Sequence, residues 1–192
     1  FAFSLIPQAE HIVPHGLPPC TNVDGEKTYD FAVAVDVNTD LPHHMWRKNI
    51  PLVNAVAKSG KTICTPSAAR AVKCDAYTEP PLLYTKARYA LVLSHSEGFG
   101  LPAAEAMSCG TPVIYLDAPA VNEFAVGYRI PAVFKGYKRD WALPWAYGAW
   151  EPAATVEEIA DVVEEALGEE VEVEYRRGFD EMAEEICSAV RR

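Results

Sequence analysis

Two glutamates and three glycines gather in the segment 94–113, which reads SHSEGFGLPAAEAMSCGTPV. Glu97 directly precedes Gly98, Gly100 follows two residues later, and seven residues separate Glu97 from Glu105. Carboxylates accept hydrogen bonds from paired hydroxyl groups such as those of a sugar or a ribose. Glycines allow the backbone to approach a ligand closely. The segment therefore predicts a site for a polar ligand that is rich in hydroxyl groups.

The elements around this segment predict how it is positioned. An apolar run at 90–93 indicates a buried strand, and a helix is expected from Leu101 or Pro102 to Cys109 because proline stands at its start and glycine after its end. A loop that joins a strand to a helix presents the unpaired N–H groups of the first helical turn above the carboxyl end of the strand. These groups can bind an anion, so we expect a ligand with an anionic middle and hydroxyl-bearing ends.

The rest of the chain predicts the sheet that carries this loop. Apolar runs rich in β-branched residues occur at 31–35, 62–64, 90–93 and 112–116, and a helical pattern at 51–58 lies between the first two. Strands that alternate with helices are typical of a parallel sheet with crossover helices. We therefore predict an α/β fold, a Rossmann-like doubly wound parallel sheet, with residues 1–192 forming a single domain.

Two helices and one irregular segment are expected toward the end of the chain. Thr155 and Glu158 form a capping box at the start of an amphipathic helix. A second amphipathic helix is expected to present an apolar stripe of Tyr175, Phe179, Met182, Ile186 and Val190. The aromatic-rich segment 134–152, with Trp141, Trp145 and Trp150, is interpreted as a long ordered loop. Packing over the sheet is the favoured role for its tryptophans, and an interface with a partner is the alternative.

Composition excludes several classes of function. The 192 residues include 27 Asp and Glu against 17 Lys and Arg, a formal net charge of −10 that argues against binding nucleic acid. No apolar stretch approaches the length of a membrane span. The five cysteines are an odd number, widely spaced and without a Cys-x-x-Cys pair, so no disulfide framework is predicted and Cys109 is expected to be a small buried residue. These features favour a reducing, cytoplasmic location.

The string from Ser94 to Val113 closely resembles the donor-binding core of the retaining GT-B glycosyltransferases of family 4, whose hallmark is the spacing seen between Glu97 and Glu105. Three weaker resemblances flank it in the family's order, at 11–17, 47–49 and 82–94. Together they cover about 11–168 and imply one half of a GT-B fold, the C-terminal nucleotide-sugar-binding domain. Residues 1–18 then resemble the inter-domain linker, and 171–192 a C-terminal helix.

The resemblance also implies a role for each matching residue. Glu97, as the catalytic residue, would contact hydroxyls of the donor sugar, and Glu105 would bind the nucleotide ribose. Lys48 would neutralise the diphosphate, with Arg47 as a helper, and a plain surface position for Lys48 is the alternative. The family needs no metal, so no metal site and no cofactor beside the nucleoside-diphosphate sugar are expected. Backbone lining the sugar and diphosphate would come from Gly98, Phe99, Gly100 and Leu101.

The sequence departs from the family pattern at several positions. Residues 34–37 lack the arginine that the family usually carries after the first strand, and His15 stands where the family generally has asparagine. The family's acceptor site and an important histidine belong to its N-terminal domain, which implies an acceptor domain, a partner chain or a homodimer as the missing half. His95, within the motif, is interpreted as a loop spacer, with ligand contact as the alternative.

Three functions stay open on these residues. The first is a retaining transferase that moves a hexose from a nucleoside diphosphate to an unknown acceptor. The second is a stand-alone nucleotide-sugar-binding module that needs a partner chain or is non-catalytic. The third and weakest is a sugar-nucleotide epimerase on the same fold.

Overall fold

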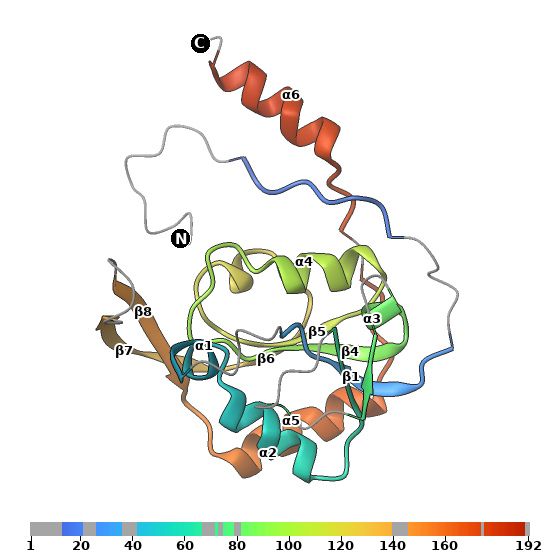
Figure 1. Cartoon of the computed structure of the whole chain (residues 1–192), viewed down its shortest axis with the longest axis vertical. Helices are drawn as coiled ribbons and strands as arrows, with labels where there is room; N and C mark the ends of the chain where they lie inside the picture. Colours follow the sequence, from blue (N-terminus) through green and yellow to red (C-terminus); the bar gives the residue numbers. More distant parts are fainter. Residues whose placement is uncertain are drawn as a thin grey trace.

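The computed structural model describes residues 13–20, 26–35, 42–66, 72, 75–78, 82–139, 146–173 and 175–190. Its centre is a parallel sheet of six strands in the order β3-β2-β1-β4-β5-β6 (Figure 1). The strands are β1 (Tyr29–Ala32), β2 (Ile63–Thr65), β3 (Ala76–Tyr77), β4 (Ala87–Val92), β5 (Val113–Leu116) and β6 (Gly127–Ile130). The α/β class and the doubly wound sheet predicted from the sequence are confirmed.

All four predicted strands are present, and the sheet extends further than the sequence indicated. β1 begins two residues before the predicted run and ends at Ala32, whereas β4 begins at Ala87, earlier than predicted. β3 and β6 were not predicted. β3 has only two residues, and β6 lies at an edge where only Ile130 is buried, so neither strand has the continuous apolar run of a central strand.

Helices cover both faces of the sheet (Figure 1). The predicted helices are confirmed as α2 (Ile50–Lys58), α4 (Leu101–Ser108) and α5 (Val156–Gly168), and short helices add α1 (Pro42–Arg47), α3 (Leu82–Thr85) and the 3-10 helix η3 (Val121–Glu123). The buried side chains of α2 and α5 share one apolar cluster, and those of α3 and α4 share another. These clusters are the two cores on opposite faces of a doubly wound sheet.

The capping box that predicted α5 is formed. Glu158 N–H donates to Thr155 Oγ1 at 3.2 Å, and Thr155 N–H donates to Glu158 Oε2 at 2.7 Å. The helix buries Ile159, Val163 and Ala166 and leaves its acidic residues in solvent. Reciprocal capping satisfies backbone donors that the helix start would otherwise leave unpaired.

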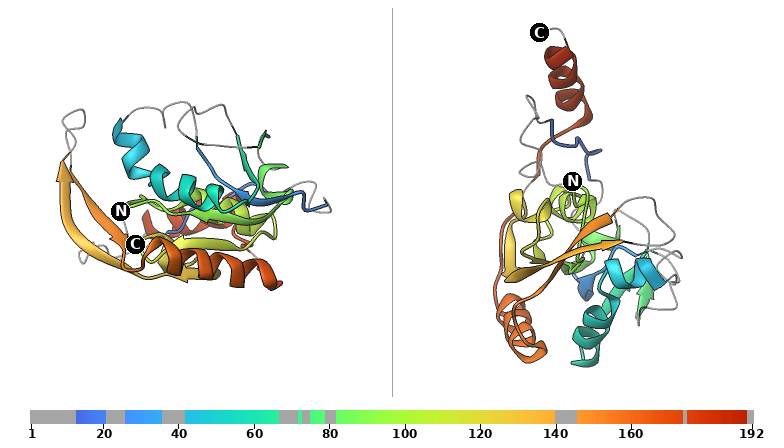
Figure 2. Two further views of the ribbon diagram at one scale, coloured as in Figure 1. Left: turned by 90° about the horizontal axis from the view of Figure 1, so that it is seen from below. Right: turned by 90° about the vertical axis from the view of Figure 1, so that its left-hand side faces the viewer.

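The prediction of an ordered loop at 134–152 is wrong, because this segment belongs to an antiparallel hairpin of β7 (Ala132–Arg139) and β8 (Ala146–Pro152). Aromatic residues favour strands once a partner strand is available, which a single-segment pattern does not reveal. Phe134 and Tyr137 are 45% and 75% exposed, so they do not pack over the sheet, whereas Trp150 packs against the core. Trp141 and Trp145 lie outside the described residues. Figure 2 shows the hairpin standing out from the layers of the fold.

The prediction that no disulfide forms is also wrong, although Cys109 is buried as expected. Cys20 and Cys109, which are 89 positions apart in sequence, form a disulfide with their Cα atoms 5.1 Å apart. Count and spacing could not indicate this pair, because only the fold brings the segment 13–20 against the end of α4. Cys64 is a buried free thiol and Cys187 an exposed one.

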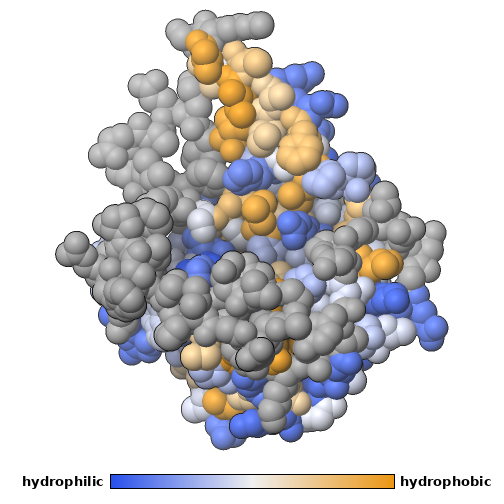
Figure 3. Space-filling view, in the orientation of Figure 1, coloured by the Kyte–Doolittle hydropathy of each residue, from blue (hydrophilic) through white to orange (hydrophobic). Residues whose placement is uncertain are grey.

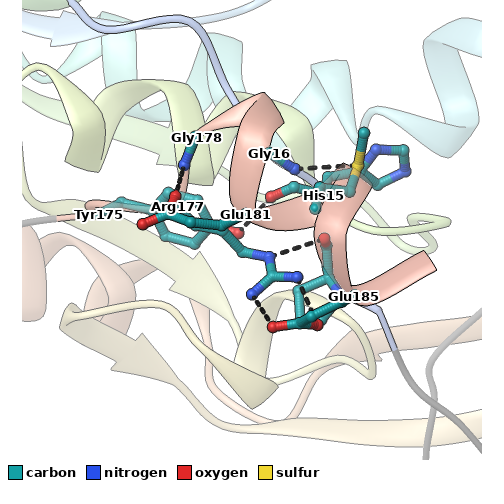
Figure 4. Close-up of polar contacts among 9 residues, drawn as sticks. His15, Gly16, Tyr175, Arg177, Gly178, Glu181 and Glu185 are labelled. Carbon is teal, nitrogen blue, oxygen red and sulfur yellow. Dashed lines mark hydrogen bonds and ion pairs between the residues drawn. The ribbon is translucent and has the colours of Figure 1, made fainter. Parts of the chain in front are cut away.

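The two ends of the described chain lie side by side, as the close-up in Figure 4 shows. Tyr175 Oη donates to the His15 carbonyl at 2.8 Å, Arg177 Nε donates to the Pro14 carbonyl at 2.9 Å, and Leu17 N–H donates to the Arg177 carbonyl at 2.9 Å. These contacts join Tyr175 and Arg177, which lie outside any helix, to the segment 14–17. The last helix, α6 (Phe179–Val190), therefore starts after Tyr175 and not at it.

The apolar face predicted for α6 exists but does not pack on the domain. No residue of α6 is buried, and Phe179, Ile186 and Val190 are among its exposed apolar side chains. Figure 3 shows apolar side chains gathered along this helix at the top of the molecule. None of the helices in the described parts of the chain has the length and apolar character needed to cross a bilayer.

Candidate functional site at the carboxyl edge of the sheet

The motif loop lies at the carboxyl end of β4 and leads directly into α4. Gly100 is the N-cap residue of α4 and has φ = 97°, a left-handed conformation that side-chain-bearing residues rarely adopt. A Cβ atom at this position would come within 2.7 Å of Val121 Cγ2. Glycine is thus required both for the turn and for the close approach of η3. Pro102 occupies the first turn of α4, where its missing N–H costs no hydrogen bond.

Glu97 is held by two cations in this loop. Lys48 Nζ lies 2.6 Å from Glu97 Oε1, and Arg47 Nη1 lies 3.5 Å from Glu97 Oε2. The Glu97 and Lys48 side chains are only 11% and 16% exposed, so the alternative of a plain surface lysine does not hold. Arg47 Nη1 also donates to the carbonyl of Ser96 at 3.3 Å.

The charge of Glu97 is stabilised in spite of its burial. Desolvation acts to raise the pKa of this carboxyl, but the attraction of Lys48, and then of Arg47, outweighs it. The pKa of Glu97 consequently lies below its ordinary value. Glu97 is therefore a buried anion at neutral pH, with both carboxylate oxygens able to accept hydrogen bonds.

The two cations reach Glu97 from the turn between α1 and α2. Lys48 N–H donates to the His44 carbonyl at 2.9 Å, and Asn49 N–H donates to the Trp46 carbonyl at 2.8 Å. Asn49 then takes a left-handed conformation, φ = 52°, as the N-cap residue of α2. Asparagine tolerates this conformation better than most side-chain-bearing residues. The sharp change of direction at Asn49 places Arg47 and Lys48 over the motif loop.

Glu105 lies on α4 and has a partner of its own. Tyr84 Oη donates to Glu105 Oε2 at 2.8 Å, and Tyr84 itself is 1% exposed. Burial, followed by the charge of Glu105 and this hydrogen bond, raises the pKa of Tyr84 well above its ordinary value, so the hydroxyl stays a proton donor. The bond orients a half-buried carboxylate that the sequence singled out. Tyr84 was missed, because nothing in its local pattern separates it from a core residue.

A row of aromatic rings links the motif loop to both ends of the described chain. His15 meets Phe99 edge-on with ring centroids 4.9 Å apart, Phe99 stacks on Phe124 at 4.9 Å, and Phe124 meets Tyr175 at 5.9 Å. His15, a departure from the family pattern, thus contacts a residue of the predicted donor loop. Gly98 and Leu101 of the same loop are exposed.

A hollow of about 950 Å³ lies at the opposite, amino edge of the sheet and includes none of the predicted site residues. Its lining combines cations and carboxylates, among them Lys27, Arg88 and Glu169. Lys27 donates to Thr111 Oγ1 at 3.1 Å, and burial lowers its pKa. The ends of the strands that carry the motif lie elsewhere, so this hollow is not the candidate site. In the described part of the chain, no three His, Cys, Asp or Glu side chains come together as a metal site.

Comparison with known proteins identifies the family of the chain that carries this site. The family model of the glycosyl transferases group 1 matches residues 72–185, more than half of the chain. The chain belongs to this glycosyltransferase family. The matched region contains the motif loop, α4, both site glutamates and Tyr84, whereas Arg47 and Lys48 precede it.

Two curated relatives of the chain come from one filamentous virus. "Putative glycosyltransferase ORF378" of Acidianus filamentous virus 2 is 31% identical over 165 residues, covering 77% of this chain and 41% of that protein. "Putative glycosyltransferase ORF330" of the same virus is 48% identical over 59 residues, covering 31% of this chain and 18% of that protein. The chain thus spans less than half the length of each of these relatives.

Comparison with a solved structure agrees with the fold of the chain. A crystal structure of a TarM mutant from S. aureus, in complex with Fondaparinux, alpha-GlcNAc-glycerol and UDP, superposes with a TM-score of 0.58 at 14% identity. The superposition covers 96% of this chain and 41% of TarM. The likeness places the described fold among the GT-B glycosyltransferases.

Proposed function

We propose that the chain is the donor-binding domain of a retaining hexosyltransferase, which moves a hexose from a nucleoside diphosphate to an acceptor. The observation that carries this proposal is the buried Glu97 carboxylate held 2.6 Å from Lys48 at the start of α4. At this position a carboxylate that can accept hydrogen bonds from sugar hydroxyls lies next to a cation that can bind phosphate. The family membership supports the same reaction class.

Donor binding exchanges the partners of these two residues. The diphosphate accepts hydrogen bonds from Lys48 and Arg47, and the first-turn N–H groups of α4 add positive potential. Glu97, released from Lys48, accepts hydrogen bonds from the sugar hydroxyls. Glu105, oriented by Tyr84, accepts from the ribose diol. Each end of the donor thereby meets a group of complementary chemistry.

The same groups assist departure of the nucleoside diphosphate. Negative charge grows on the leaving phosphate as the sugar bond breaks, and fixed cations nearby stabilise that charge. Lys48, Arg47 and the N-terminus of α4 supply this field, so the proposed reaction proceeds without a metal ion or a cofactor. Retention of the anomeric configuration, as in the family that the motif resembles, is part of the proposal. The cytoplasmic location stays a prediction.

Calorimetric titration with UDP-, GDP- and ADP-sugars, run beside Glu105→Ala, tests the proposal. We expect one nucleotide series to bind and the variant to lose that binding. No binding to any of these donors would overturn the proposal. When a donor is found, product analysis with a panel of acceptors determines the new linkage and its anomer. A changed sugar without a new linkage indicates an epimerase instead.

A second candidate is a nucleotide-sugar-binding module that transfers only together with a partner chain. One observation favours it: no residue of α6 is buried, and Phe179, Ile186 and Val190 of its apolar face are exposed. Saturable donor binding without transfer or donor hydrolysis, even at high protein concentration, would support this candidate. Transfer by the 192-residue chain alone would exclude it.

A further inference from the structure

His95 lies where three separate segments of the chain meet. It belongs to the motif loop, two residues before Glu97, and is only 7% exposed. One of its neighbours is the turn that carries Arg47 and Lys48, and the other is strand β8 of the hairpin. These contacts make His95 more than a spacer within the motif loop.

The hydrogen bonds of His95 join these segments directly. Its backbone N–H donates to the Arg47 carbonyl at 2.9 Å, and its own carbonyl accepts from Trp150 N–H at 3.1 Å. Its Nδ1 lies 2.7 Å from the Trp150 carbonyl oxygen. Because a carbonyl oxygen only accepts hydrogen bonds, Nδ1 carries the proton in this contact. His95 and Trp150 thus exchange two hydrogen bonds, one through the backbone and one through the ring.

The imidazole ring also packs against the cation-bearing turn. Trp46 stacks on His95 with ring centroids 4.4 Å apart and an angle of 14° between the planes. Three consecutive residues make these contacts. Trp46 stacks on the His95 ring, the Arg47 carbonyl accepts from the His95 backbone, and the Lys48 ammonium binds Glu97. A change in the position of His95 therefore moves the cations that face Glu97.

We propose that His95 is a positioning residue: it fixes Arg47 and Lys48 relative to Glu97 and makes the donor affinity of the site depend on attachment of the β7–β8 hairpin. This inference rests on the proposed donor site and adds a residue and a structural element to it. His95 acts through its neighbours, and its ring faces Trp46 and Trp150. The side-chain hydrogen bond is the part of the arrangement that a substitution can remove selectively.

Four substitutions distinguish the contribution of the His95 ring from that of its hydrogen bond to Trp150. His95→Phe keeps a stacking ring and loses the donor to Trp150, whereas His95→Ala loses both. His95→Asn places an amide N–H near the position of Nδ1, and His95→Gln places one near Nε2 instead. We expect donor affinity to fall roughly tenfold in the Ala, Phe and Gln variants, since the part-buried Trp150 carbonyl loses its side-chain partner, and to stay within about threefold of wild type in His95→Asn. Such rescue by Asn alone is not expected of a residue that merely fills space.

A second readout needs no ligand. Hydrogen exchange of the free protein reports on the amides of 44–50, whose hydrogen bonds form the turn. We expect faster exchange at 44–50 and at Trp150 in His95→Phe, wild-type exchange in His95→Asn, and no change in α5 in either variant. Thermal unfolding of every variant shows whether the whole domain is destabilised.

The two readouts distinguish failure of this inference from failure of the proposed function. If wild type binds a nucleotide sugar and His95→Phe binds it equally well, the positioning role is wrong. If wild type binds no nucleotide sugar, the proposed function fails, and exchange alone decides the role of His95. Unchanged exchange at 44–50 in His95→Phe then overturns the inference, and faster exchange that Asn restores supports it.

Discussion

The hydroxyl of Tyr84, in the short helix before β4, donates a 2.8 Å hydrogen bond to Glu105 Oε2 on α4. A core tyrosine thereby orients the carboxylate that we expect to bind ribose. Tyr84→Phe removes the donor and leaves the ring in place. We expect donor affinity to fall roughly three- to tenfold, measured by calorimetric titration. Tyr89→Phe is the matched control, since its hydroxyl meets a backbone carbonyl at Glu169, outside the site. Equal affinity of the two variants would contradict the ribose role.

Lys48→Met tests the cation that faces Glu97. The substitution keeps most of the side-chain length and removes the charge expected to bind the diphosphate. We expect donor affinity to fall roughly 10- to 100-fold, because a charge-assisted hydrogen bond is lost. Lys61→Met is the control, since Lys61 forms an ion pair of the same 2.6 Å length with the exposed Glu164. A similar loss in both variants would mean that the effect is unrelated to the site.

Glu97→Gln tests the lowered pKa of Glu97. The pKa of Glu97 is lower in the folded protein than in the unfolded chain, so in mild acid the unfolded chain binds more protons than the folded protein. The ionised carboxylate therefore stabilises the folded state at pH values above the ordinary carboxyl pKa. That contribution is lost as pH falls through the native pKa. We expect wild type to be more stable than the variant at neutral pH and the difference to shrink on acidification, measured by urea unfolding. A difference that stays constant with pH would contradict the ion-pair account.

The disulfide makes stability depend on the redox state. Reduction, or Cys20→Ser, releases a closed loop with a sequence separation of 89. The chain-entropy model gives a loss of about 4.6 kcal/mol for a loop of this size. We expect a lower Tm in both cases, and peptide mapping without reductant should recover the linked Cys20 and Cys109. Cys187→Ser, at an exposed free thiol, is the control and should leave Tm unchanged. Free thiols at both 20 and 109 in the unreduced protein would contradict the pairing.

Gly16→Ala tests the contact between the two ends of the described chain. A Cβ atom at Gly16 would overlap the carbonyl oxygen of Gly178. We expect the segment 13–18 to separate from Arg177, with a loss of about 1–3 kcal/mol in unfolding free energy and earlier proteolysis before α6. Gly168→Ala is the control, because a Cβ there meets no atom within 4 Å. Wild-type stability of Gly16→Ala would show that the contact contributes little.

The sequence by itself determined the central strands, the main helices and the identity of the motif loop. Apolar runs predicted the central strands, and proline, glycine and the capping box at Thr155 predicted the ends of the main helices. These signals are local: each depends on the conformational preferences and side-chain periodicity of a few neighbouring residues. Glu97 and Glu105 could be singled out because their surrounding glycines and spacing lie within one continuous string.

Tertiary structure alone decided which residues meet. Lys48 and Glu97 are 49 positions apart, and Cys20 and Cys109 are 89 apart, so no local pattern contains either pair. The hairpin was missed for the same reason, since its strand character depends on pairing across a turn. His95 gained its role only when β8 and the α1–α2 turn met at the motif loop. Local preference selects an element, but contact between distant side chains is set by how the sheet brings the elements together.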